Sequence, residues 1–272
     1  MRRRTALALV GAAACAPARA LAASSGTLAW YAAKTNGGEH AASNENDVLP
    51  AASIIKLLIA MTLIEQARAG EFDLATGVAL NGADRVGGSE RFGSAAPRAY
   101  PPTAMIDAML SLSDNTASNA LLRTAGMPRC NAVALAHRLE RTRIRRRFYD
   151  WEAQRRGLEN VTTARESAQL LLLIAAAAGE RGEGGAVARR AMRALLAQED
   201  HETIPAALPN RRNIANKTGE LPGVRNDVGI VGYAYPAAYV ISVMDRYGNA
   251  SRATAIESIR GVVRMVDHKL GG

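Results

Sequence analysis

One stretch near the N-terminus constrains the fold of this chain more than any other. From Ile54 to Ile64 nearly every residue is apolar, and Lys56 is the one charged residue in the run. The pattern predicts a helix from Ser53 to Ala69, ended by Gly70. A helix without a polar face has to be surrounded by protein. The 272-residue chain is 48% apolar, which is enough to enclose it in a packed core.

Strand patterns flank this helix and return near the C-terminus. Before it, a strand is predicted over 27–34, then a glycine turn and a second strand to about residue 42. After Pro209, strands are predicted over 213–217, 228–235 and 239–244, followed by a closing helix over about 252–270. The segment between is mostly helical, with helices predicted over 103–112, 117–124, 131–139, 164–178 and 186–197.

Strands at both ends with helices between them indicate an α+β fold of two lobes. One lobe is an antiparallel sheet flanked by helices, built from residues 24–72 and 198–272, and the other is a mostly helical insertion, residues 73–197. A cleft between two packed lobes is a common place for a functional site.

The first 23 residues are expected to be an export signal. Three arginines precede a short apolar run, and Ala18-Arg19-Ala20 follows as a small-residue cleavage site. Cleavage after Ala20 and after Ala23 are both compatible with the sequence, and a lipid anchor at Cys15 is a weaker alternative. The expected location is the periplasm or the exterior, without stable membrane insertion.

Charge and cysteine content narrow the expected partners. Removal of the four arginines of the signal lowers the formal charge from +9 to +5. The basic segment 141–147 has few interleaved aromatic residues, so a solvated surface is favoured over a nucleic-acid site. Cys130 alone remains after processing, which excludes an internal disulfide and favours a small buried residue. A monomer is expected.

Ser53 and Lys56 stand three residues apart at the start of the apolar helix. Residues i and i+3 share a helix face, so the Lys56 amine is within reach of the Ser53 hydroxyl. A helix-capping serine and a solvated lysine are the alternative interpretation, but a lysine in so apolar a run has little water to reach. A buried lysine near other cations has a depressed pKa and can take a proton from a serine near neutral pH.

Two later motifs carry side chains of the same kinds. Ser113-Asp114-Asn115 falls between two predicted helices, either as a loop that presents side chains to the cleft or as the N-cap of the next helix. Lys217-Thr218-Gly219 ends a predicted strand, where Gly219 allows close approach of the backbone to a bound molecule. A strand that simply ends in a glycine turn is the alternative. Each motif alone is a weak signal.

Taken together and in this order, the three motifs resemble the signature of the class A β-lactamases and penicillin-binding proteins. The resemblance covers essentially the whole chain after the signal, and includes Leu49 to Ala52, Asn115 to Asn119, Thr162 to Arg165 and Asn226-Asp227. It implies a β-lactamase-like fold and a serine hydrolase that needs no metal or other cofactor.

The resemblance also implies a role for each site residue. Ser53 would be the nucleophile, Lys56 its base or proton relay, and Ser113 the donor to the leaving nitrogen. The backbone N–H groups of Ser53 and Glu220 would form the oxyanion hole. Asn115 would orient Lys56 and the substrate. The residues expected to bind substrate, including its carboxylate, are Asn115, Lys217, Thr218, Gly219, Glu220 and Arg225.

A class A enzyme also carries a carboxylate that activates the water for release of the acyl group, in the pattern Glu-x-x-x-Asn. Here Glu152 resembles the start of that pattern, but Arg156 occupies the place of the asparagine, which Asn160 would have to supply. Glu152 is therefore the expected catalytic carboxylate, with Asp150 and Glu159 as rivals. A solvated charge among arginines is the alternative interpretation of Glu152.

Glu220 is a second departure from the family pattern, because a carboxylate beside an anion pocket repels the acidic group of a β-lactam unless Arg225 or Lys217 neutralises it. The predicted function is the opening of β-lactam amides through an acyl-Ser53 ester. One alternative is a D,D-peptidase or esterase relative, acting on peptidoglycan peptides, that acylates but deacylates slowly. Another is a non-catalytic domain that binds or senses β-lactams.

Overall fold

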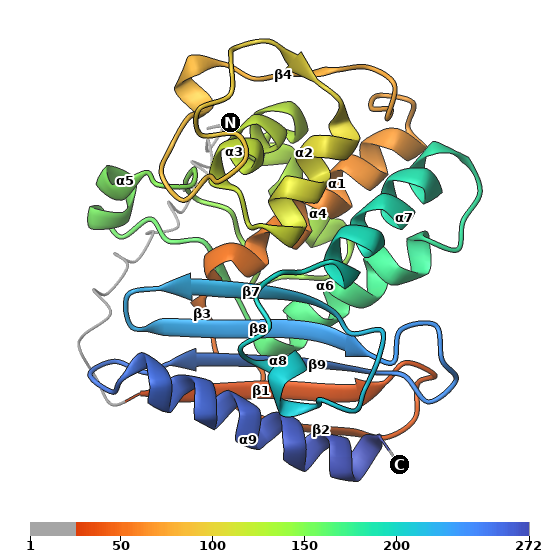
Figure 1. The fold of residues 1–272 in the computed structure, drawn as a ribbon, viewed down its shortest axis with the longest axis vertical. Coiled ribbons are helices and arrows are strands. Elements are labelled where there is room, and N and C mark those ends of the chain that lie inside the picture. Colours follow the sequence, from red (N-terminus) through yellow and green to blue (C-terminus); the bar gives the residue numbers. More distant parts are fainter. Residues whose placement is uncertain (1–25, 272) are drawn as a thin grey trace, which may run out of the picture.

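The computed structural model describes residues 26–271. The expected signal peptide, with Cys15, lies outside the described residues. Five strands form one antiparallel sheet: β1 (Thr27–Lys34), β2 (His40–Ser43), β7 (Ala215–Leu221), β8 (Val224–Val231) and β9 (Tyr239–Arg246). Their order is β2-β1-β9-β8-β7, so strands from both ends of the chain share one sheet (Figure 1). The predicted α+β class is confirmed.

Helices cover both faces of this sheet. The C-terminal helix α9 (Arg252–Leu270) and the short α8 (Ile204–Ala207) lie on one face, and α6 (Ala164–Ala177) lies on the opposite face (Figure 1). Because apolar elements cover them on both sides, β8 and β9 are buried along almost their whole length. β7 is an edge strand, so part of its backbone faces away from the sheet.

The apolar stretch of the N-terminal third is enclosed, as its sequence requires. It forms a 3₁₀ helix, η1 (Ala52–Ile55), that leads into α1 (Lys56–Arg68), and within α1 only Glu65 and Arg68 are not buried. The helices packed around α1 are α2 (Pro102–Ser111), α3 (Asn115–Ala125), α4 (Met127–Ala136), α6 and α7 (Gly182–Leu196). The N-terminus of α1 points toward β7, because η1 packs directly on that strand.

The remaining elements are short. They are β3 (Leu49–Pro50), β4 (Val78–Ala79), η2 (Gly82–Asp84), β5 (Ala99–Tyr100), α5 (Trp151–Arg155) and β6 (Val161–Thr162). The antiparallel pair β3–β6 joins the segment just before Ser53 to the segment just after α5. This pairing holds the α4–α6 connection beside η1. The five-residue α5 and the four-residue α8 are too short to give a helical period in the sequence.

Several strand limits differ from the sequence prediction, and β8 ends at Val231 where the prediction ran to residue 235. Lys217-Thr218-Gly219 does not end its strand, because β7 continues to Leu221 and turns into β8 at Pro222-Gly223, where Gly223 has φ +76°. β8 begins at Val224, four residues earlier than predicted. Its first residues, Arg225 to Asp227, are polar and read as a loop, yet they are buried and bound to other side chains.

Three further expectations concern Cys130, membrane insertion and the boundaries of the lobes. Cys130 is buried in the core, and burial raises the pKa of its thiol to about 11, as suits a small structural residue. In residues 26–271 we find no helix with both the length and the apolar character to cross a bilayer. The division of the chain into lobes at residues 72/73 and 197/198 stays a prediction.

Candidate active site

A pocket of about 380 Å³ opens beside Ser53. It is formed by η1, the N-terminus of α3, the segment from the end of α4 through α5, and the β7–β8 turn. The lining residues are Ala52, Ser53, Asn115, Arg146, Phe148, Tyr149, Trp151, Glu159, Asn160, Glu220, Leu221, Pro222 and Tyr247. Parts of the chain that are more than a hundred residues apart in sequence therefore meet around one hydroxyl.

Ser53 lies in a strained and tightly packed turn. It is the second residue of η1, and Ala52 before it has φ +48°, a left-handed conformation that costs a non-glycine residue about 1–3 kcal/mol. Gly219 of β7 lies against this turn. A Cβ atom on Gly219 would lie 3.1 Å from Ser53 N and 3.0 Å from Ala51 O. The missing side chain allows the backbone of β7 to approach the Ser53 N–H group.

Lys56 follows Ser53 at the first turn of α1, and its side chain is fully buried. Its amine donates to the Ser113 carbonyl oxygen at 2.5 Å, to Ser113 Oγ at 3.0 Å and to Asn115 Oδ1 at 2.9 Å. Burial, and next the charge of Lys217, hold the pKa of Lys56 well below its usual range. A buried amine of this kind can lose its proton and act as a base.

The Ser113 loop is fixed from several sides. Ser113 has φ +59°, and Asp114 caps α3 by accepting from Ala117 N at 2.8 Å. The same carboxylate accepts from the backbone N–H groups of Arg91 and Phe92 at 3.0 and 2.9 Å. The motif is therefore both a loop that presents a side chain and the N-cap of α3. Asp114 anchors the turn, and the turn presents the Ser113 hydroxyl to Lys56.

Lys217 lies on β7 and is also fully buried. Its amine donates to the carbonyl oxygen of Thr218 at 2.9 Å, and burial lowers its pKa to about 8. Lys217 precedes Gly219 by two residues on β7, the strand on which η1 packs, and its charge helps to lower the pKa of Lys56. The structure thus brings Ser53, Lys56, Ser113 and Lys217 to one region between the helices and the sheet.

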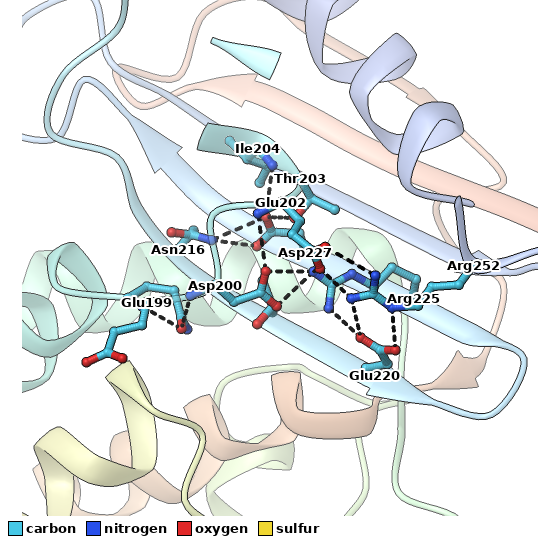
Figure 2. A network of polar contacts seen from close by, with 12 residues as sticks. Glu199, Asp200, Glu202, Thr203, Ile204, Asn216, Glu220, Arg225, Asp227 and Arg252 are labelled. Atoms are coloured by element: carbon cyan, nitrogen blue, oxygen red, sulfur yellow. Dashed lines mark hydrogen bonds and ion pairs between the residues drawn. The ribbon is translucent and has the colours of Figure 1, made fainter. Parts of the chain in front are cut away.

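Arg225 does not line the pocket. Its guanidinium is buried and donates to both oxygens of Asp200 at 2.8 Å and to Glu220 at 2.8 Å (Figure 2). Both Nη groups of Arg225 are occupied by carboxylates, and the side chain is only 1% exposed, which leaves it out of reach of a molecule in the pocket. The geometry therefore does not support the expected contact between Arg225 and a substrate carboxylate. Lys217 and Thr218 are also buried and outside the pocket lining, but no carboxylate forms an ion pair with Lys217, so these two remain the candidate anion-binding groups among the described residues.

Glu220 lines the pocket, and two arginines outside the pocket lining neutralise its charge. Arg225 Nη1 lies 2.8 Å from Glu220 Oε2, and Arg252 Nε lies 2.7 Å from Glu220 Oε1 (Figure 2). Two guanidinium groups thus neutralise the carboxylate, which removes most of its repulsion toward an acidic substrate group. The network continues through Asp200 and Glu202 to the segment before α8.

The structure places Glu152 away from the pocket. Its side chain is 72% exposed and pairs with Arg156 at 3.0 Å, one turn along α5. The rival Asp150 caps α5 by accepting from Ala153 N at 2.9 Å. The short helix α5 therefore turns Glu152 toward solvent, and the geometry does not support it as the carboxylate of this site.

Of the three carboxylates named from this segment, Glu159 is the one that lines the pocket near Ser53. Its oxygens accept from Arg146 Nε at 3.0 Å, from Arg146 Nη2 at 2.7 Å and from Gln154 at 2.9 Å. Asn160 lies beside it and accepts from the backbone N–H groups of Arg145 and Arg146 through Oδ1. The sequence named Glu159 only as a rival, and nothing in its spacing signalled that Arg146 holds it.

Two aromatic residues of the pocket were also missed from the sequence. Tyr149 and Trp151 line it from the start of α5, with ring centroids 5.0 Å apart. The sequence signal that could have indicated a binding surface is this aromatic pair, which flanks Asp150 directly after the basic segment 141–147. Among the described residues, no group of three or more His, Cys, Asp or Glu side chains is arranged to hold a metal ion.

Comparison with known proteins gives a consistent result. The family model of the "Beta-lactamase enzyme family" matches residues 15–268. A search of curated protein sequences found no match. Solved structures are similar over nearly the whole fold: a β-lactamase from Xanthomonas campestris pv. campestris superposes with a TM-score of 0.79 at 20% identity, covering 91% of this chain and 92% of that one.

Two further structures are similar to the same extent. A β-lactamase from Sphaerobacter thermophilus has a TM-score of 0.76 at 23% identity, covering 92% of this chain and 94% of its own. A mutant of PBP-A, solved as an acyl-enzyme complex with penicillin G, has a TM-score of 0.77 at 25% identity, covering 90% of each chain.

Proposed function

The chain belongs to the β-lactamase enzyme family, and on this premise we propose that it opens β-lactam amides through an ester on Ser53. The observation that carries the proposal is the environment of Lys56. Its amine is buried, holds three oxygen contacts to Ser113 and Asn115, and has a pKa lowered by burial and by Lys217. Burial that lowers the pKa of an amine beside a serine hydroxyl is the environment that a general base requires.

In the proposed acylation, the neutral Lys56 amine takes the proton of Ser53 Oγ as that oxygen attacks the lactam carbonyl carbon. The carbonyl oxygen, now negatively charged, is stabilised by the N–H groups of Ser53 and Glu220. The Lys56 ammonium returns the proton through Ser113 Oγ, 3.0 Å away, to the lactam nitrogen as the C–N bond breaks. The step ends with an acyl-Ser53 ester and a neutral Lys56.

Substrate binding is assigned to β7 and α3. A fully buried cation at Lys217 attracts the carboxylate of a β-lactam, and the Thr218 hydroxyl adds a neutral donor. Asn115 presents its Oδ1 to Lys56, while its Nδ2 donates to Gly88 O at 2.9 Å. This arrangement supports a positioning role for Asn115 toward Lys56.

Release of the acyl group is assigned to Glu159 in place of Glu152. Glu159 lines the pocket with Ser53, and a carboxylate there can take a proton from water as that water attacks the ester. Both of its oxygens already accept from Arg146, and one also accepts from Gln154, so a water has to share them with these donors.

A second candidate function follows from these contacts. A carboxylate whose oxygens are held by Arg146 and Gln154 places a water less readily, so deacylation would be slow, and the protein would acylate rapidly and hold the product, as a D,D-peptidase-like relative or a β-lactam trap does. The two functions share the acyl-Ser53 ester and differ only in the rate at which it is hydrolysed.

Turnover of a chromogenic cephalosporin separates these possibilities. We expect Ser53→Ala to abolish hydrolysis, Glu159→Gln to lower the steady-state rate by about 10²-fold or more, and Glu152→Gln to leave it unchanged. A burst of one product per enzyme followed by a slow phase in the wild type identifies the second function. Loss of turnover in Glu152→Gln would return the hydrolytic role to that residue.

We also propose that the mature protein is an exported monomer. The basic and apolar order of the first 23 residues supports export. Cell fractionation with mass measurement of the mature N-terminus tests the location, and light scattering tests the oligomeric state. Retention of residues 1–23 in the cytoplasm, or a dimer mass, would contradict these two statements.

A further inference from the structure

The proposed chemistry assigns no role to one buried polar side chain of β8. Asn226 is 0% exposed, and its register partner on β7 is Gly219. Residues directly opposite each other in an antiparallel pair project to the same face of the sheet. The turn before the nucleophile packs on this face, since a Cβ atom on Gly219 would point at Ala51 and Ser53. Because Gly219 has no side chain, the space between the Asn226 amide and that turn stays open.

The Asn226 amide binds the backbone that leads to the nucleophile. Its Nδ2 donates to Pro50 O at 2.9 Å and to Ala51 O at 3.3 Å. These are the two carbonyl groups immediately before Ala52, whose φ is +48°. Ala51 O also accepts from Ile54 N at 3.1 Å, across the start of η1. One side chain of the sheet thus holds both peptide oxygens that precede the strained residue.

The same turn is held from a second side. Ala51 N donates to Asn160 O at 2.8 Å, beside the pairing of Pro50 with Val161 in the β3–β6 ladder. A left-handed conformation at a non-glycine residue persists only where the surroundings fix it from several directions. Here Asn226 supplies the bonds from the sheet, and Asn160 supplies the bond from the segment after α5.

The hydrogen bonds of Asn226 are one-sided. Its Oδ1 is buried and has no hydrogen-bond partner among residues 26–271. A buried acceptor without a donor offsets much of the stability that the two donated bonds contribute. What the amide does provide is direction, because both donated bonds end on the turn that carries the nucleophile.

We propose that Asn226 is a positioning residue for acylation: by holding the two carbonyl groups before Ala52, it directs the Ser53 N–H group toward the oxyanion. This inference rests on the proposed function, in which that N–H group stabilises the charged carbonyl oxygen of the lactam. The peptide group of Ala51 O and the peptide group of Ser53 N are joined at the Cα atom of Ala52. A rotation of the first peptide group is therefore passed directly to the second.

The direct test separates the chemical step from binding. Asn226→Ala should lower the second-order rate constant for acylation by benzylpenicillin by about 10²-fold, since displacing a positioned oxyanion donor has an effect of that order. Binding without an oxyanion should survive. In a Ser53→Ala background, Asn226→Ala should change the dissociation constant of benzylpenicillin by less than about twofold, because the group it positions acts mainly on the transition state.

Asn131→Ala is the matched control. Asn131 on α4 also joins two segments through its amide, donating to Ile144 O at 2.9 Å and accepting from Ile144 N at 2.9 Å, and it does not line the pocket. We expect this variant to lose stability in urea denaturation but to acylate at the wild-type rate. Asn226→Val removes the donor and leaves a side chain that suits a strand, so it keeps the test valid if Asn226→Ala does not fold. It should acylate as slowly as Asn226→Ala.

Phenylboronic acid gives a second readout, at equilibrium. A bond forms between Ser53 Oγ and boron, the serine proton passes to Lys56, and the tetrahedral boronate resembles the state in which the oxyanion is formed. Asn226→Ala should weaken this adduct by about tenfold or more.

The outcomes distinguish the inference from the function on which it rests. Acylation and boronate binding at the wild-type level in the Asn226 variants would overturn the positioning role and leave the proposed function in place. An equal loss of acylation in Asn131→Ala would also overturn it, because general destabilisation would then explain the effect. Absence of an acyl-Ser53 ester in the wild type would refute the proposed function itself, and the inference with it.

Discussion

At the scale of single residues, the choice of lysine over arginine marks the site. The chain has only four lysines, Lys34, Lys56, Lys217 and Lys269, among 34 basic residues. Two of these four, Lys56 and Lys217, are fully buried, while arginine supplies nearly all other cations. Arginine stays protonated at any accessible pH, whereas a buried lysine can lose its proton. The pattern fits Lys56, whose loss of a proton is part of the proposed chemistry.

The pH dependence of acylation tests these two lysines. The pKa of Lys56 is depressed, and only its neutral form accepts the Ser53 proton, so the rate should fall as the pH drops below that pKa. The pKa of Lys217 is about 8, and only its charged form attracts a carboxylate, so the rate should fall again as the pH rises past about 8. We predict a bell-shaped profile of kcat/KM for a carboxylate-bearing β-lactam.

Lys217→Arg is the informative variant for this profile. An arginine keeps its charge, so the alkaline limb should move beyond pH 10 while the acid limb stays in place. Lys269→Arg, at an exposed position at the end of α9, is the matched control and should reproduce the wild-type profile. An alkaline limb near pH 8 that persists in Lys217→Arg would show that another group controls it.

At the scale of elements, the contact between β7 and η1 sets how closely the β7 backbone approaches Ser53 N. The proposed oxyanion hole depends on this approach. β7 is the edge strand of the sheet, and η1 packs against it at Gly219. The sequence interpretation took Gly219 as the end of a strand, because glycine after a strand usually signals a turn. The turn comes at Pro222-Gly223 instead, and Gly219 is needed for close packing.

Gly219→Ala should therefore impair acylation strongly while the protein stays folded. The new methyl group would separate β7 from Ser53 N, and loss of one oxyanion donor lowers the rate by about 10²–10³-fold. Stopped-flow acylation and thermal unfolding give the two measurements. Gly261→Ala is the control: a Cβ there meets no atom within 4 Å, and it should leave acylation unchanged and stabilise α9 by up to ~1 kcal/mol. Full acylation by Gly219→Ala would remove the oxyanion argument.

The elements that were hardest to predict are those whose polar residues are buried. Arg225 to Asp227 read as a loop, but Thr203, Ile204 and Asn216 donate to Asp227, and the segment is the start of β8 (Figure 2). Partners of this kind lie far away in sequence and leave no local period. By contrast, β1, α1 and α9 were predicted well, because their apolar patterns follow from burial alone.

The residues of the candidate site also fall into those that local sequence predicts and those whose position depends on distant partners. Ser53, Lys56 and Ser113 could be named from their order and spacing, because short local motifs place them. The position of Glu152 could not, because a single turn of α5 decides which carboxylate reaches the pocket. Arg225 was expected to face the substrate, but it is bound by the carboxylates of Asp200 and Glu220, a pairing that no sequence spacing reveals.

At the scale of the whole molecule, the Arg225 network joins segments from four parts of the chain. Asp200 and Glu202 lie between α7 and α8, Glu220 lies on β7, and Arg252 begins α9 (Figure 2). The network lies behind the pocket wall that carries Glu220. The network therefore ties the segment before α8 and the start of α9 to Glu220, a residue of the pocket wall.

Arg225→Leu tests whether this network is structural. It would leave several carboxylates without their buried partner, and we expect a loss of about 2–4 kcal/mol in the free energy of unfolding, reduced because those carboxylates are partly exposed. Urea denaturation measures the loss, and KM for a carboxylate-bearing β-lactam in the folded variant should change little. Unaltered stability with a large rise in KM would show instead that Arg225 contacts the substrate.

The central claim is that the hydroxyl of Ser53 forms a covalent ester whose formation needs the buried Lys56. Intact-protein mass after brief exposure to benzylpenicillin, followed by peptide mapping, tests it most directly. We predict an increase equal to one whole penicillin molecule, located on the peptide with Ser53, absent in Ser53→Ala and strongly slowed in Lys56→Ala. An adduct on another residue, or hydrolysis that continues in Ser53→Ala, would contradict the account.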